Sequence, residues 1–141
     1  MNNILIDTGF WIALYDRRDS YNGVANDMFE YLTLGNVIIP YPSLYETINT
    51  RFVKNTPAMR SFKILLEKTN FQLMNDVDYK EFALESTFSF ACNSNRSLSL
   101  VDMVIRQMLA DERLSISHLI SFNQGDFQDI CTRRNIQIFS D

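Results

Sequence analysis

The sequence predicts one α/β domain over residues 1–141, in which a small parallel sheet of about four to five strands is covered by helices on both faces. Short apolar runs that suit buried strands alternate along the chain with longer segments whose apolar residues recur at helical spacing. This alternation implies parallel strands joined by helical crossovers. With 141 residues, 46% of them hydrophobic, and no repeat or long linker, the chain suits one domain with a substantial core.

Five apolar runs are candidates for the strands. The first stops at Asp7, Thr8 and Gly9, as a buried strand that enters a tight turn does. The second is closed by Pro40 and Pro42. The predicted strands comprise residues 3–6, 37–40, 71–74, 118–121 and 137–139.

Seven segments between the strands are predicted to be helical from their apolar spacing or composition. They comprise residues 10–15, 25–32, 44–52, 57–69, 77–91, 101–109 and 127–133. Gly35 stands where the C-cap of the second helix belongs. In the fifth helix, Leu84, Phe88 and Ala91 share one apolar stripe.

The overall charge gives no support to nucleic-acid binding. The chain carries 13 Lys and Arg against 17 Asp and Glu, a net charge of -4. Proteins that hold nucleic acid mainly through phosphate contacts tend to be basic. A cluster of metal-binding carboxylates would itself add negative charge, however, so the total excludes no local basic surface.

The termini and cysteines predict a cytoplasmic protein that is not associated with a membrane. The first residues lack the basic region and cleavage site of a signal peptide, and no apolar run reaches the ~18 residues that cross a bilayer. Cys92 and Cys131 have neither metal-site spacing nor a histidine cluster beside them, which favours a reducing compartment. His118, the one histidine, lies within a predicted strand and is interpreted as structural.

Four acidic residues occupy similar local positions. Asp7 and Asp126 each follow a predicted strand, Glu46 comes after the second strand at the start of a helix, and Asp102 opens the most periodic helix. In open parallel sheets, ligands bind at the carboxyl ends of the strands, where the strand order reverses. A cluster of carboxylates there needs protonation or cations, and oxygen ligands favour Mg²⁺ or Mn²⁺.

Helix capping is the competing interpretation of three of these acids. Ser43–Glu46 and Ser99–Asp102 match the S-x-x-[DE] capping box, and Asn123–Asp126 is a looser match. Taken singly, each acid is better explained as a cap than as a metal ligand. The two roles are compatible, because a capped carboxylate is held rigidly and stays ionised.

Four segments together resemble the PIN-domain family along nearly the whole chain. They are Ile4–Thr8, Pro42–Glu46, Leu98–Asp102 and Ile120–Phe127, the last with an N-x-x-D-F element. The resemblance implies a PIN-like three-layer domain whose acidic catalytic and metal site consists of Asp7, Glu46, Asp102 and Asp126. Residues 16–25 also resemble the family, although Tyr21 stands where many members carry histidine.

Among PIN domains the chain looks most like the VapC-type toxins of toxin–antitoxin modules. That resemblance implies a Mg²⁺- or Mn²⁺-dependent endoribonuclease with RNA as substrate, an antitoxin protein as partner, and a homodimer or higher oligomer. Thr8, Ser121 and Asn123 are candidates to orient the carboxylates. The alternative is a catalytically silent PIN-fold module that acts through a protein partner.

Basic residues are the candidates for holding phosphates, although such runs are more often solvated surface. Arg106 lies four residues after Asp102, so an ion pair between them is its simplest explanation, and contact with the scissile phosphate is the other. The remaining candidates are Arg17, Arg18, Arg51, Lys54, Arg60 and Lys63.

Overall fold

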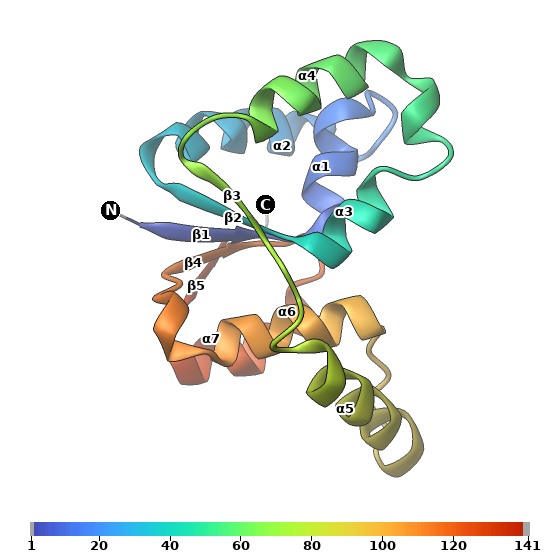
Figure 1. Cartoon of the computed structure of the whole chain (residues 1–141), viewed down its shortest axis with the longest axis vertical. Coiled ribbons are helices and arrows are strands. Elements are labelled where there is room, and N and C mark those ends of the chain that lie inside the picture. The colour runs from blue at the N-terminus through green and yellow to red at the C-terminus, as the bar shows by residue number, and fades with distance from the viewer. Residues whose placement is uncertain (1, 140–141) are drawn as a thin grey trace.

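The computed structural model describes residues 2–139, apart from the side chain of Thr33, so residues 1, 140 and 141 of the predicted domain lie outside the described residues. Five parallel strands form one sheet in the order β3-β2-β1-β4-β5, and helices cover both of its faces (Figure 1). The predicted three-layer α/β fold is therefore confirmed. Within the described residues, no helix has the length and apolar character needed to span a membrane.

The predicted strands are all present, with small differences at their ends. They are β1 (Asn3–Ile6), β2 (Asn36–Pro40), β3 (Phe71–Met74), β4 (His118–Ile120) and β5 (Gln137–Phe139). From the central strand β1, the chain builds outward through β2 and β3, then crosses back to add β4 and β5 on the other side. The carboxyl ends of β1 and β4 therefore lie side by side where the strand order reverses, which is the expected place for a ligand site.

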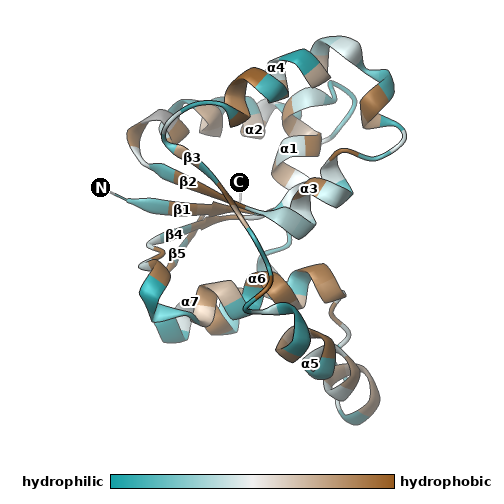
Figure 2. Ribbon diagram, in the orientation of Figure 1, coloured by the Kyte–Doolittle hydropathy of each residue, from teal (hydrophilic) through white to brown (hydrophobic). Residues whose placement is uncertain are grey.

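Two helical layers enclose separate cores on the two faces of the sheet. One layer contains α1 (Thr8–Tyr15), α2 (Asn22–Phe29), α3 (Tyr41–Thr47) and α4 (Thr56–Leu66), and the other contains α5 (Lys80–Asn93), α6 (Leu100–Ala110) and α7 (Gln128–Arg134). Side chains alternate across β1, so Ile4 and Ile6 join the first core and Leu5 joins the second. Figure 2 shows the hydrophobic residues of the central strands between these layers.

The third helix is shorter than its apolar spacing predicts. Helix α3 ends at Thr47, and Phe52 lies in a separate 3₁₀ helix, Phe52–Lys54. Between them, the side chain of Asn49 accepts a hydrogen bond from the backbone N–H of Phe52 at 2.9 Å and so supports the new turn. Leu44 and Phe52 still reach the same core, which is why their spacing imitates one helix.

Gly35 is the C-cap of a 3₁₀ helix, Glu30–Leu34, that continues α2, so its predicted position is confirmed. Its φ of -147° is extended, whereas a glycine C-cap is usually left-handed. A Cβ atom there would lie 2.8 Å from the backbone oxygen of Asn2. Glycine therefore allows the helix end to approach the chain beside β1.

The predicted apolar stripe of the fifth helix faces solvent. Helix α5 begins at Lys80, and Leu84 and Phe88 are 48% and 64% exposed, whereas Ala83 is fully buried. In Figure 1, α5 projects from the body of the domain and packs beside α6. Apolar residues occur around most of this helix, so their spacing does not identify the face that packs.

Candidate active site

Asp7 is the most deeply placed of the four predicted acids. It follows β1 and is the N-cap of α1, and only 4% of the residue is exposed. Its Oδ1 accepts a hydrogen bond from the backbone N–H of Thr8 at 2.7 Å, and its Oδ2 accepts one from the Ser121 hydroxyl at 2.9 Å. These bonds fix the carboxylate at the junction of β1 and β4.

Burial of the carboxyl group raises the pKa of Asp7 from 3.8 to about 6. The hydrogen bonds from Ser121 and from the backbone of Thr8 oppose this rise, while the nearby charges of Asp102 and Glu46 add to it. A carboxylate in such surroundings is stabilised by a cation, which offsets both the burial and the repulsion.

Glu46 lies near the end of α3, not at its start as predicted from the sequence. Helix α3 is capped by Pro40 without a side-chain hydrogen bond, so the Ser43–Glu46 capping box is wrong. Instead, the Thr8 hydroxyl donates to Glu46 Oε1 at 2.8 Å, although these residues are far apart in the sequence. Glu46 is exposed, which places it at the rim of a site with Asp7 at the floor.

The capping interpretation of Asp102 is confirmed. Ser99 is the N-cap of α6, and its hydroxyl accepts a hydrogen bond from the backbone N–H of Asp102 at 3.1 Å. The Asp102 carboxyl is half-buried, and burial raises its pKa, helped by the charges of Asp126 and Glu46 and opposed by Ser99. The cap therefore holds a residue that also faces other acids.

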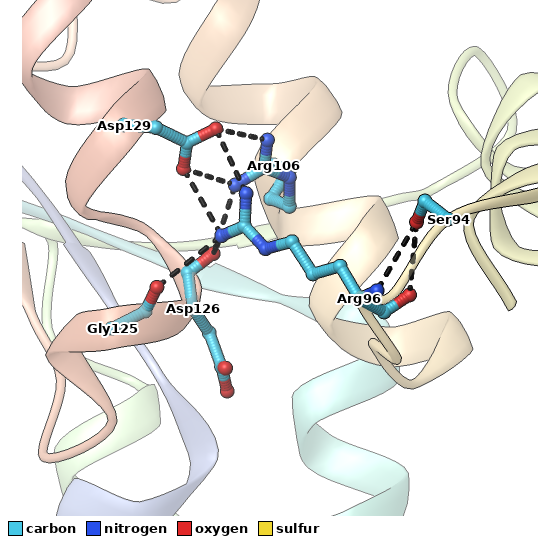
Figure 3. A network of polar contacts seen from close by, with 6 residues as sticks. All are labelled: Ser94, Arg96, Arg106, Gly125, Asp126 and Asp129. Atoms are coloured by element: carbon cyan, nitrogen blue, oxygen red, sulfur yellow. Dashed lines mark hydrogen bonds and ion pairs between the residues drawn. The ribbon is translucent and has the colours of Figure 1, made fainter.

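Asp126 is held through its backbone, in the 3₁₀ helix Gln124–Asp126 that precedes α7. Its carbonyl oxygen accepts hydrogen bonds from Arg106 at 2.8 Å and from Arg96 at 3.2 Å. Figure 3 shows the Asp126 carboxylate pointing away from both guanidinium groups. The third capping pattern is not formed, because Asn123 makes no side-chain cap bond.

The predicted ion pair between Arg106 and Asp102 is wrong. Arg106 is only 8% exposed and makes two bonds, of 2.7 and 2.8 Å, to the carboxylate of Asp129, which also binds Arg96 (Figure 3). Arg106 thus ties α6 to α7 and fixes the backbone of Asp126. Neither Arg96 nor Asp129 was predicted to belong to this network, because the i,i+4 spacing offered Arg106 a nearer partner in Asp102.

The four acids meet as an electrostatic cluster. Asp7 feels the charges of Asp102 and Glu46, and Asp102 feels those of Glu46 and Asp126. Among the described residues, none of the four carboxylates has a salt-bridge partner. No three His, Cys, Asp or Glu side chains in the described part have the spacing of a preformed metal cage.

Of the predicted orienting residues, two contact the acids through their side chains. The hydroxyl of Thr8 donates to Glu46 and its backbone N–H donates to Asp7, while the hydroxyl of Ser121 donates to Asp7. Asn123 instead donates its backbone N–H to the Ser121 hydroxyl at 3.0 Å, which helps to hold that hydroxyl. Phe122 lies between Ser121 and Asn123. Tyr21, found where the family resemblance expects histidine, stacks on its ring with 4.3 Å between the ring centroids.

Comparison with solved structures finds a protein of similar architecture. The chain is similar to the Mycobacterium tuberculosis toxin VapC20, described as cleaving the sarcin–ricin loop, with a TM-score of 0.70 and 22% sequence identity. The superposition covers 89% of this chain and 94% of VapC20. The chain has a PIN-type fold. No family model and no curated protein matches the sequence.

Proposed function

We propose that the chain is a divalent-metal-dependent endoribonuclease and the toxin of a toxin–antitoxin pair. The observation that carries this proposal is the buried carboxylate of Asp7, placed where the strand order reverses and facing other acids without a cationic partner among the described residues. The PIN-type fold shared with an RNA-cleaving toxin supports the choice of RNA as substrate.

The donor set fits Mg²⁺ or Mn²⁺. All four candidate ligands are carboxylates, which hard cations prefer, and a positive ion would relieve the conditions that raise the pKa values of Asp7 and Asp102. Mg²⁺ usually keeps several waters and binds through only one or two carboxylates. The open spacing of these acids suits such a water-rich site. When bound, the metal would lower the pKa of a water and stabilise charge on the leaving oxygen.

The four acidic side chains would have different catalytic roles, according to how deeply each is buried. Asp7, fixed by Thr8 and Ser121, supplies a rigid anionic floor. Asp102 and Asp126, each half-buried, approach from the start of α6 and from the 3₁₀ helix before α7. Exposed Glu46, oriented by the Thr8 hydroxyl, would hold and deprotonate the attacking water.

An antitoxin would act as a second protein that covers this site or the surface beside it. The proposal of a toxin rests on the architectural likeness to VapC20, together with the length and the sequence resemblance of the chain. Co-expression with the product of a neighbouring small gene should relieve growth arrest caused by the wild-type chain. The Asp7→Asn variant should cause no arrest to relieve.

A cleavage assay tests the enzymatic proposal. Purified protein is incubated with an RNA that contains a sarcin–ricin loop, in Mn²⁺, in Mg²⁺ or in EDTA, and the products are mapped by gel. We expect cleavage that depends on the metal and is lost in Asp7→Asn. The exposed Asp27 provides a matched control, because Asp27→Asn removes the same charge from the surface of α2.

The alternative is a silent module that keeps the fold and acts only by binding a protein. That function predicts equal results for wild type and Asp7→Asn, both in the cleavage assay and in Mn²⁺ titration by calorimetry. Metal-dependent cleavage by wild type alone would exclude it.

A further inference from the structure

A basic groove lies at the C-terminal end of α1, whereas Asp7 lies at the N-terminal end of this helix. Two adjoining hollows of about 420 and 600 Å³ share Tyr15, Asp16, Arg18 and Asn55 in their linings. Their charged lining residues are Arg17, Arg18, Arg51, Lys54 and one acid, Asp16. A chain with a net charge of -4 thus concentrates four cations around a single carboxylate.

Asp16 organises two of these cations without neutralising the surface. It accepts a bond from the Nε of Arg18 at 3.4 Å and another from an Nη of Arg51 at 3.2 Å. The arginine side chains remain 77% and 70% exposed, so most of their N–H groups point to solvent. Guanidinium groups held in this way match the paired oxygens of a phosphate. Lys54 and Arg17 form no salt bridge within the described residues.

Helix α1 and the loop after α3 connect the groove to the proposed active site. Helix α1 begins beside Asp7 and ends next to Asp16, and its eight residues span roughly 12 Å. On the other side, Asn49 lines the groove and donates its side-chain N–H to the carbonyl of Glu46 at 3.0 Å. Stacked nucleotides at ~3.4 Å each would bridge this distance with about three or four residues.

We propose that this groove binds the phosphate backbone of the RNA substrate on one side of the cleavage position, with Arg18, Arg51 and Lys54 as the main contacts. The inference rests on the proposed ribonuclease function and extends it to a substrate-binding surface. Two other basic residues that the sequence offered as phosphate contacts do not belong to this groove. Arg60 and Lys63 line a different hollow, and Lys63 pairs with Glu67.

RNA binding is measured by fluorescence anisotropy in EDTA, on the Asp7→Asn background, so that neither cleavage nor metal affects the result. The test variant adds Arg51→Ala and Lys54→Ala. The control adds Lys68→Ala and Arg133→Ala, which remove the same two residue types from exposed positions outside the groove lining, near the amino ends of β3 and β5. A third variant, Arg51→Lys with Lys54→Arg, keeps both charges.

The groove variant should bind RNA about tenfold more weakly, since two charge-assisted phosphate contacts are lost. The slope of log affinity against log salt concentration should become shallower by about 1.4, because each phosphate contact with a single strand contributes about 0.7 to it. The control should match the parent, and the charge-preserving variant should recover most of the salt dependence. Equal affinity and slope in the groove and control variants would overturn the proposal.

A polyglutamate competitor distinguishes RNA from an acidic protein segment. If the groove substitutions weakened polyglutamate binding but left RNA binding unchanged, the proposal would be wrong and the groove would suit a protein partner. The separate cleavage assay keeps the two proposals apart. A protein that bound RNA through the groove but never cleaved it would retain this inference and lose the proposed function.

Discussion

Replacing Asp7 with asparagine should stabilise the metal-free protein at neutral pH. Burial raises the pKa of Asp7 from 3.8 to about 6, so an ionised Asp7 destabilises the fold by up to about 3 kcal/mol. Asparagine removes the charge at nearly constant volume and still accepts a hydrogen bond from the N–H of Thr8. We expect a net gain of about 1–3 kcal/mol, or roughly 3–9 °C in Tm, for a chain of this size.

The pH dependence gives this gain a distinctive form. Below pH 3.8 the carboxyl is protonated in both the folded and the unfolded chain, so wild type and Asp7→Asn should differ little. As the pH rises from 3.8 to about 6, the folded state retains the proton that the unfolded state releases, and wild type loses stability. Above that range the difference should reach its plateau.

Urea denaturation in EDTA, at several pH values between 4 and 8, measures this difference directly. The other ionisable groups are common to both proteins, so their contributions largely cancel in the comparison. Asp27→Asn, at an exposed position, should change stability by less than about 0.5 kcal/mol. If Asp7→Asn proved less stable than wild type at pH 8, burial of an uncompensated charge would not describe this site.

Three further substitutions test the packing and the polar network. Gly35→Ala should cost about 1–3 kcal/mol in urea denaturation, since its Cβ would lie 2.8 Å from the Asn2 oxygen. Asp129→Ala should cost about 2–4 kcal/mol, because it leaves buried Arg106 without its carboxylate. Arg106 holds the pKa of Asp129 well below its usual range. The stability advantage of wild type over this variant should therefore fade as the pH falls below about 4. Ser121→Ala removes a bond that lowers the pKa of Asp7, so the acid limb of the cleavage profile should move to higher pH.

The central strands β1 and β2 were predictable because they are buried on both faces of the sheet. Runs such as Ile4–Ile6 and Val37–Ile39 are continuously apolar, and each is followed by residues that end a strand. Helix boundaries were less predictable, because packing and local capping compete. The helix that carries Leu44 ends before Phe52, where the side chain of Asn49 supports a separate turn. The apolar spacing of the sequence does not indicate this break.

The site was predictable as a set of positions but not as a network. Asp7 and Asp102 have the predicted local settings, and Ser99 caps the helix that carries Asp102. The contact of Thr8 with Glu46 depends on how α1 and α3 pack, which local patterns do not encode. For the same reason, Asp129 could not be identified from the sequence as the partner of Arg106.

The most direct test of the metal site is a crystal structure determined with Mn²⁺, using anomalous scattering to locate the ion. The account predicts an anomalous peak within direct coordination distance of the Asp7 carboxylate, with Asp102, Asp126 or Glu46 as a further ligand or bound through water. Crystals of Asp7→Asn grown in the same way should show no such peak. Fully occupied Mn²⁺ elsewhere on the protein, with none beside Asp7, would contradict the proposed site.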